Sequence, residues 1–168
     1  LVADGKKMSK KQLEGWAKLA GWTWISEFSV AWVTSESPYG RELAMKWINT
    51  GKTESTKSCG WSTYSSLMAI TPDDALDLEE IKSLLKRVED TIDSSPDRVR
   101  YTMNGFVIAV GTYVAPLLKQ AKATARKIGK VDVDMGDTSC KVPVAKEYIE
   151  KNEKAGRIGK KRKTAKCL

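Results

Sequence analysis

Hydrophobic residues recur along this chain with the 3.6-residue period of amphipathic helices, and residues that start or stop helices separate the periodic segments. In residues 22–33, apolar side chains stand at positions 24, 25, 28, 31 and 32, which is the spacing of a single helix face. Ser9 with Gln12 and Asp77 with Glu80 have the spacing of capping boxes, and prolines or glycines mark most other helix ends. The pattern predicts eight helices, at about 10–20, 22–33, 39–50, 53–70, 78–92, 96–114, 117–128 and 144–155.

Short turns join these helices, which indicates successive antiparallel pairs rather than a four-helix bundle. We expect an all-α fold, an α-α superhelix of HEAT-like repeats over residues 1–156, whose concave face suits an extended partner. Residues 131–135 alternate as VDVDM but lie in a long loop at 130–142, so we predict no strand there. The chain starts without Met, on apolar residues typical of a helix end, and we expect the repeat domain to be N-terminally incomplete.

Positive charge is concentrated at the C-terminal end. The formal net charge is +8, but the last fifteen residues hold seven of the 29 Lys and Arg and no acid, which leaves the rest near neutral. Residues 157–168 therefore form a predicted basic tail that binds phosphates by charge and counterion release, and the alternative is a solvated terminus without a ligand. The candidate cations are Arg157, Lys160, Lys161, Arg162 and Lys163.

The residue types exclude several classes of chemistry. The chain has no histidine, so catalytic triads, His-liganded metals and imidazole acid–base catalysis are ruled out. Three widely spaced cysteines, Cys59, Cys140 and Cys167, fit neither a disulfide framework nor a zinc site and favour a reducing, cytoplasmic compartment. No apolar run approaches the ~20 residues of a membrane span. We expect no metal, no small-molecule cofactor, no membrane partner and a monomeric protein.

Two short stretches combine residues that suit a charged ligand. Trp24 and Glu27 fall on one helix face, where an indole and a carboxylate could bind a cationic group together. The alternative is a Trp at the rim of the core beside a solvated Glu. Arg98 and Arg100 open a helix, where guanidinium and backbone N–H groups could hold a phosphate, and the alternative is charge on a solvated first turn.

Asn104 and Gly105 interrupt the most apolar helix of the chain. Gly in a helix interior costs about 1 kcal/mol relative to Ala, so it needs a compensating role. Either a neighbouring helix packs closely or a ligand approaches the backbone, and packing is the favoured alternative. Asn104 is a candidate donor to a phosphate.

Four stretches together resemble a known family, namely CGWSTYSSL, DLEEIKSLLKRVEDTID, DRVRYTMNGFVIAVGTYVAPLL and MGDTSCKVP. They are similar to the bacterial DNA alkylation repair enzymes, the AlkD-like HEAT-repeat alkylpurine DNA glycosylases, over the C-terminal two-thirds or so of a member. The resemblance implies an α-solenoid that holds double-stranded DNA on its concave face and hydrolyses the N-glycosidic bond of cationic N-alkylated purines. Such a base leaves without a general acid, so a carboxylate that stabilises the oxocarbenium-like sugar suffices.

The resemblance also implies site residues. The family's Trp, followed four positions later by an Asp, falls on WISEF, where Trp24 matches and Phe28 occupies the acid position. Glu27 is the nearby carboxylate and becomes the candidate catalytic residue. The family's DNA-clamping Arg falls near Lys57, and its second cleft Trp corresponds to Phe106 after Gly105.

Three functions follow as hypotheses. The first is a metal-independent DNA glycosylase that uses Glu27, with Trp24 and Phe106 in the cleft. The second is a non-catalytic nucleic-acid-binding solenoid. The third is a protein-interaction scaffold, which an acidic concave face would favour; the residues that would make it acidic are Asp77, Glu79, Glu80, Glu89 and Asp90.

Overall fold

The computed structural model describes residues 3–137 and 140–166, and these residues fold into α-helices, short helical turns and irregular segments. The α-helices are α1 (Lys10–Leu19), α2 (Ala31–Ser35), α3 (Gly40–Thr50), α4 (Glu54–Ile70), α5 (Leu78–Thr91), α6 (Asp97–Tyr113), α7 (Leu118–Ile128) and α8 (Ala145–Lys154). A π-helix, η2 (Ile25–Val30), precedes α2 and forms most of the predicted second helix. Short 3₁₀ turns lie at η1 (Gly5–Lys7), η3 (Asp73–Ala75) and η4 (Ala115–Leu117). The predicted all-α fold is confirmed.

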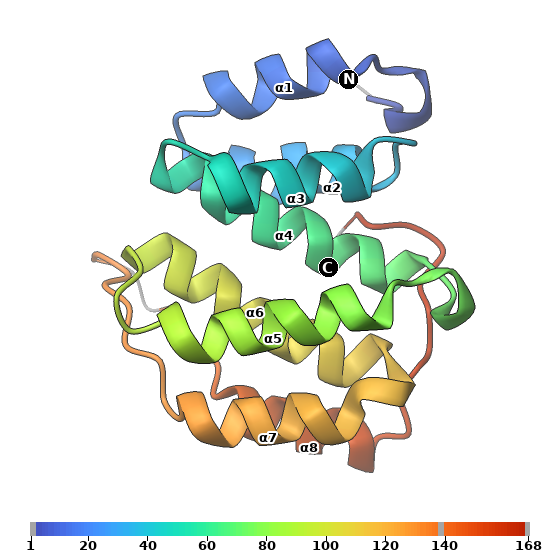
Figure 1. The fold of residues 1–168 in the computed structure, drawn as a ribbon. Helices are drawn as coiled ribbons and strands as arrows, with labels where there is room; N and C mark the ends of the chain where they lie inside the picture. Colours follow the sequence, from blue (N-terminus) through green and yellow to red (C-terminus); the bar gives the residue numbers. More distant parts are fainter. Residues whose placement is uncertain (1–2, 138–139, 167–168) are drawn as a thin grey trace.

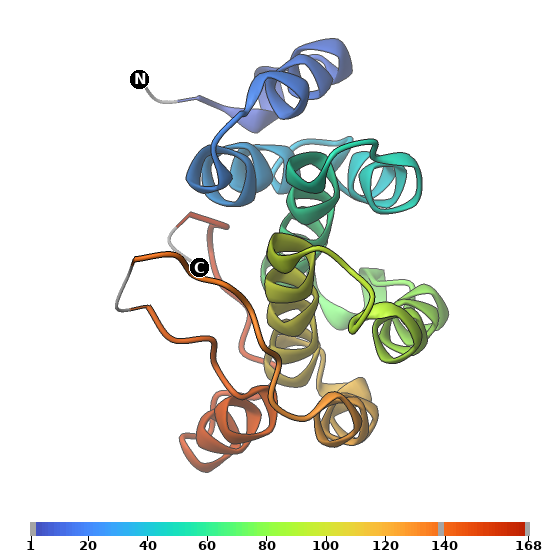
Figure 2. The same ribbon diagram turned by 90° about the vertical axis from the view of Figure 1, so that its left-hand side faces the viewer.

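The helices form two layers that advance from the N-terminal to the C-terminal end of the molecule (Figures 1 and 2). The outer layer contains α3, α5 and α7, and the inner layer contains η2 with α2, α4 and α6, with α8 packed beside α6. Local signals explain the helix starts, since Ser9 and Gln12 form both hydrogen bonds of the predicted capping box. The predicted solenoid of antiparallel pairs is therefore the observed architecture.

Two glycines let helices of this solenoid approach closely. A Cβ on Gly60 of α4 would lie 2.8 Å from the backbone nitrogen of Ile48 in α3, and one on Gly111 of α6 would lie 2.6 Å from Ile149 of α8. Gly105 differs, because a Cβ there would meet no atom within 4 Å. The favoured explanation that Gly105 permits close helix packing is therefore wrong, and the side of α6 that it exposes is open.

The basic tail predicted at 157–168 is not an extended arm over its described residues, 157–166. It runs across the C-terminal ends of the inner helices, where two prolines leave carbonyl groups without a donor. The carbonyls of Met68 and Thr112 would normally accept from residues four positions later, which are Pro72 and Pro116 and carry no N–H group. The tail supplies the missing donors: Lys161 Nζ lies 2.9 Å from the Met68 oxygen, and the backbone N–H of Gly159 donates to the Thr112 oxygen at 2.8 Å.

The tail continues along the same line towards α2. The backbone N–H of Arg162 donates to the Ala69 oxygen at 2.7 Å, and that of Ala165 donates to Glu36 Oε1 at 2.8 Å at the end of α2. Ala165 is buried by this contact. A basic segment at the negative ends of several helix dipoles is electrostatically favourable. The tail is thus packed onto the helical domain.

No single helix in the described part of the chain is long and apolar enough to cross a membrane. Only α6 taken with Ala115–Ile128 reaches that length and composition, and the two segments meet at a bend of 112°.

Candidate functional site

A pocket of about 560 Å³ opens on the inner layer, between the helices and the tail. One wall comes from η2 and α2, and the floor comes from α4 and α6. The tail and α8 supply the opposite side. The side chains and backbone that line it include Glu27, Phe28 and Trp32 from the first wall, Ser62, Ser66, Tyr101 and Gly105 from the floor, and Tyr148, Arg157, Lys160 and Arg162 from the opposite side. The open face of Gly105 is therefore part of this floor.

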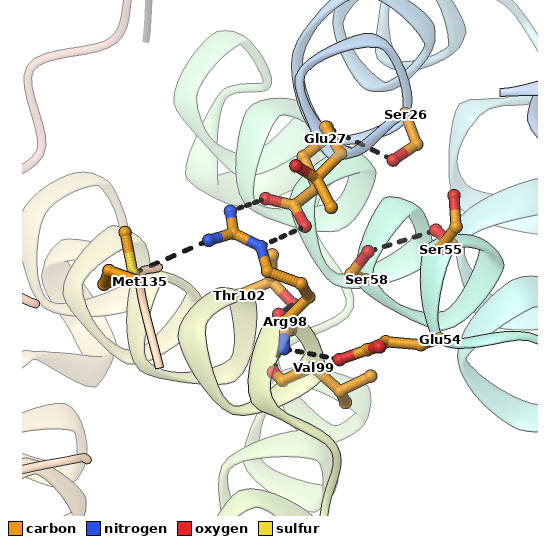
Figure 3. A network of polar contacts seen from close by, with 10 residues as sticks. Ser26, Glu27, Glu54, Ser55, Ser58, Arg98, Val99, Thr102 and Met135 are labelled. Atoms are coloured by element: carbon orange, nitrogen blue, oxygen red, sulfur yellow. Dashed lines mark hydrogen bonds and ion pairs between the residues drawn. The ribbon is translucent and has the colours of Figure 1, made fainter. Parts of the chain in front are cut away.

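Glu27 and Arg98 form a two-point ion pair at the edge of this pocket (Figure 3). Arg98 Nε lies 3.1 Å from Glu27 Oε1, and Arg98 Nη2 lies 2.5 Å from Oε2. Only 3% of Glu27 is exposed. Such a forked pair fixes both side chains and cancels their charges locally.

Further contacts hold Arg98 in this position. Its backbone N–H donates to Glu54 Oε1 at 2.7 Å, and its guanidinium lies 4.4 Å from the centre of the Tyr101 ring. A guanidinium nitrogen also lies 3.7 Å from Met135 Sδ. The predicted phosphate contact of Arg98 is therefore wrong for this arrangement, because Glu27 takes both sides of its guanidinium fork.

The ionisation of Glu27 depends on this pair. Burial raises the pKa of the Glu27 carboxyl above its ordinary value, and hydrogen bonding and charge from Arg98 oppose that shift. The carboxylate thus lies in the pocket wall, as the candidate catalytic role requires, but a fixed cation already neutralises it.

Four aromatic rings run in a line from solvent to the pocket wall, and we call them the aromatic row: Trp22, Trp24, Phe28 and Trp32. Trp24 stacks on Phe28 with ring centres 5.1 Å apart, and Phe28 meets the edge of Trp32 at 5.4 Å. Trp24 is 56% exposed, while Phe28 and Trp32 line the pocket. The helix face predicted from positions 24, 28 and 32 therefore faces the groove side, and smaller residues such as Ser26 and Ala31 are buried instead.

Two residues predicted in the cleft are buried in the core. Phe106 is fully buried, with its ring edge-on to Trp61 at 5.1 Å and to Tyr64 at 5.8 Å. Asn104 is also fully buried, and its side-chain amide donates to the carbonyl of Pro143 at 2.8 Å. The predicted roles of Phe106 as a stacking residue and of Asn104 as a phosphate donor are therefore wrong, because both side chains point away from the open side of α6.

Lys57 and Arg100 do not join the pocket. Arg100 forms an ion pair with Asp97 one helical turn earlier, and Lys57 is half-buried in the first turns of α4. Neither is among the described residues that line the pocket. A role for either in ligand binding stays a prediction.

The tail cations divide into two groups. Arg157, Lys160 and Arg162 line the pocket, which brings three of the predicted phosphate-binding residues together. Lys161 points the other way, with Nζ 2.7 Å from both the Tyr113 oxygen and Asp73 Oδ1. Lys163 is exposed outside the pocket. The predicted phosphate contact of Lys161 is wrong, because its ammonium is held by the ends of α4 and α6.

The acidic residues that would have made the concave face negative lie on α5 and its N-cap, in the outer layer (Figure 2). Arg41 bonds both Asp77 and Glu80, and Lys127 bonds Glu89. The remaining two acids pair with lysines of their own helix, Glu79 with Lys82 and Asp90 with Lys86. None of the five is among the described residues lining the pocket. Negative charge and the pocket cations are thus on different faces of the solenoid.

Sequence reasoning missed the hydroxyl-bearing floor of the pocket, formed by Ser62, Ser65 and Ser66 of α4. The available signal was the run STYSS, in which small polar residues interrupt a helix that is otherwise buried. A helix in contact with neighbours on most sides has little need for serine unless part of it faces a polar space.

Comparisons with known proteins identify relatives of this chain. No family model matches. The uncharacterized protein Lin0241 of Listeria innocua is 38% identical over 152 residues, and Lmo0209 of Listeria monocytogenes, also uncharacterized, is 36% identical over the same length. These matches cover 90% of this chain and 64% of each relative, so the chain spans less than two-thirds of their length.

A solved structure matches more fully. It is described as a member of "a new family of proteins related to the HEAT-like repeat DNA glycosylases with affinity for branched DNA structures". Its sequence is 35% identical, its TM-score is 0.88, and the match covers 96% of this chain and 68% of that one. With the same helical architecture and this level of identity over that share of both chains, the chain belongs to the family related to the HEAT-like repeat DNA glycosylases.

Proposed function

We propose that this chain binds DNA along its inner layer, with the sugar–phosphate backbone at the pocket. The observation that carries the proposal is the convergence of Arg157, Lys160 and Arg162 on one pocket, while the acids of α5 lie in the outer layer. Cations gathered on one face bind phosphates through counterion release even when the rest of the molecule is near neutral. The affinity of the solved relative for branched DNA supports the same class of ligand.

The proposed binding does not include base hydrolysis. A glycosylase of this type needs a carboxylate whose charge stabilises the oxocarbenium-like sugar. In this chain Arg98 holds both oxygens of the candidate carboxylate, Glu27, so little net negative charge remains to act on a sugar. The pair suits a structural role at the edge of a binding surface.

A binding measurement tests the first part. The triple variant Arg157→Gln, Lys160→Gln, Arg162→Gln should bind a fluorescent four-way junction and a plain duplex at least about tenfold more weakly in anisotropy titrations. Its salt dependence should fall by about one unit of slope per lost phosphate contact. The matched control removes three lysines of the outer layer, Lys82→Gln, Lys86→Gln and Lys127→Gln, and should bind nearly as the wild type does.

Equal losses in the two triple variants would contradict the proposed face, because net charge alone would then explain binding. Thermal unfolding of each variant separates loss of contacts from loss of folding.

Glycosylase activity is the second candidate function, favoured by the position of Glu27 in the pocket wall. The test is release of radiolabelled 7-methylguanine from an alkylated duplex by wild type and Glu27→Gln. We expect release at the spontaneous rate from both proteins. Release above that rate by wild type, lost in Glu27→Gln, would establish the glycosylase and overturn the non-catalytic proposal.

A further inference from the structure

We propose that the aromatic row is a stacking site for an unpaired base of the bound nucleic acid strand, with Trp22 as its outermost element. The inference rests on the proposed DNA-binding function and adds a ligand for residues that the pocket cations do not explain. No role has been derived above for Trp22.

The geometry of the row supports stacking. Trp24, Phe28 and Trp32 are four residues apart, so they lie along one side of η2 and α2. Trp22 lies before the helix, with its ring centre 6.5 Å from that of Trp24 and tilted by 50°. Each ring supports the next, and the row stays ordered at its exposed end without a partner.

The exposure of the row shows where a ligand is missing. Trp22 is 62% exposed, whereas Trp47 and Trp61 of the same chain are buried. Trp22 and Trp24 form a contiguous apolar surface, and such surfaces on a folded domain commonly mark binding sites. The inner end of the row is not exposed in this way, because Phe28 and Trp32 form the pocket wall.

The charge around the row selects the partner. The pocket wall formed by Phe28 and Trp32 faces a space that Arg157, Lys160 and Arg162 also line. Aromatic rings next to cations are the arrangement that binds a single strand, since bases stack on the rings while phosphates meet the cations. A base inside a duplex cannot present its face to Trp22 or Trp24, so the occupant is a base that has lost its pairing partner, as at a branch point.

An apolar protein surface would use the row differently. It would also cover the exposed side chains of α1, of which Trp16 and Leu19 are the largest. Trp16 therefore supplies a matched control, because it is an exposed Trp at the same end of the molecule but outside the row.

The experiment compares two DNA duplexes that differ at one position. One carries a single unpaired 2-aminopurine and the other carries the same base paired, and both are titrated with the full chain. We expect the unpaired probe to bind about tenfold more tightly and its fluorescence to be quenched on binding, as stacking of one base on an aromatic ring implies. The double variant Trp22→Leu, Trp24→Leu should lose the tenfold preference and the quenching, and keep wild-type affinity for the paired duplex.

Two further variants separate stacking from folding. Trp22→Phe with Trp24→Phe should retain most of the preference, because a ring remains at both positions. Trp16→Leu should behave as wild type. Loss of preference in Trp16→Leu as well would overturn the inference in favour of a general apolar surface.

The possible failures are distinguishable. Equal affinity of wild type for the unpaired and paired probes would overturn the stacking site and leave the proposed DNA binding intact. Absence of binding to either probe would overturn the proposed function itself.

Discussion

Replacing Lys161 with Met removes the ammonium group that fastens the tail to the ends of α4 and α6. Its Nζ lies 2.9 Å from the Met68 oxygen and 2.7 Å from the Tyr113 oxygen. It also lies 2.7 Å from Asp73 Oδ1, and the Lys161 side chain is 19% exposed. The substitution leaves three oxygens at a largely buried site without their shared donor.

The expected cost follows from these contacts. A hydrogen bond to a charged group contributes about 1.5–3 kcal/mol, and breaking a buried ion pair costs about 3–5 kcal/mol. Because the three contacts share one ammonium group and water reaches part of the site, their energies do not add, and we expect a loss of about 3 kcal/mol. In a chain of this size 1 kcal/mol shifts the melting temperature by about 2–4 °C, so Tm should fall by about 6–12 °C.

Thermal unfolding followed by circular dichroism measures this loss. Lys163→Met is the matched control, because it removes the same charge from an exposed position of the same segment, and it should change stability by less than about 0.5 kcal/mol. If the Tm of Lys161→Met equals that of Lys163→Met, the tail is not part of the folded unit and its proline-linked contacts are not stabilising.

Three further predictions concern the inner layer. In Gly111→Ala the added Cβ would lie 2.6 Å from Ile149, so we expect about 1–3 kcal/mol of destabilisation by overpacking in thermal or urea unfolding. Gly105→Ala meets no atom within 4 Å and should instead stabilise α6 by about 1 kcal/mol. The same Gly105→Ala variant should weaken DNA binding in anisotropy titrations if the nucleic acid approaches the pocket floor; unchanged affinity would separate Gly105 from the binding surface. Arg98→Met removes the charge that opposes the raised pKa of Glu27, so that pKa should rise further. An acid with a raised pKa in the folded state loses stability as pH rises from about 4.5 through that pKa, so the deficit of Arg98→Met against wild type should be larger at pH 8 than at pH 4. A deficit independent of pH would show that Glu27 ionisation is not coupled to Arg98.

The tail shows how a local signal and a distant contact combine. Pro72 and Pro116 are visible in the sequence as helix-ending residues, and α4 and α6 end just before them. Which group would satisfy the carbonyls that they leave open was not visible, because Lys161 is 93 residues from Met68. Charge composition predicted a phosphate-binding segment, and the folded chain uses one of its lysines as a helix cap instead.

The candidate site shows the same division. The spacing of Trp24, Phe28 and Trp32 identified a helix face, but not whether that face meets the core or the groove. Each inner helix of a solenoid has apolar neighbours on several sides, so the hydrophobic period marks a stripe without saying what covers it. Phe106 was misplaced for this reason, since it follows Gly105 in sequence but packs on Trp61 in the core.

The sequence by itself determined the eight helices, their order and the solenoid architecture, because periodicity, capping residues and prolines act over a few residues. It also located the excess of positive charge at the C-terminal end. Only the tertiary structure decided that Arg98 neutralises Glu27, that three tail cations share a pocket with Phe28 and Trp32, and that Gly105 borders open space. These pairings join residues tens of positions apart, and the free energy of an ion pair or a buried ring depends on a partner that local sequence does not specify.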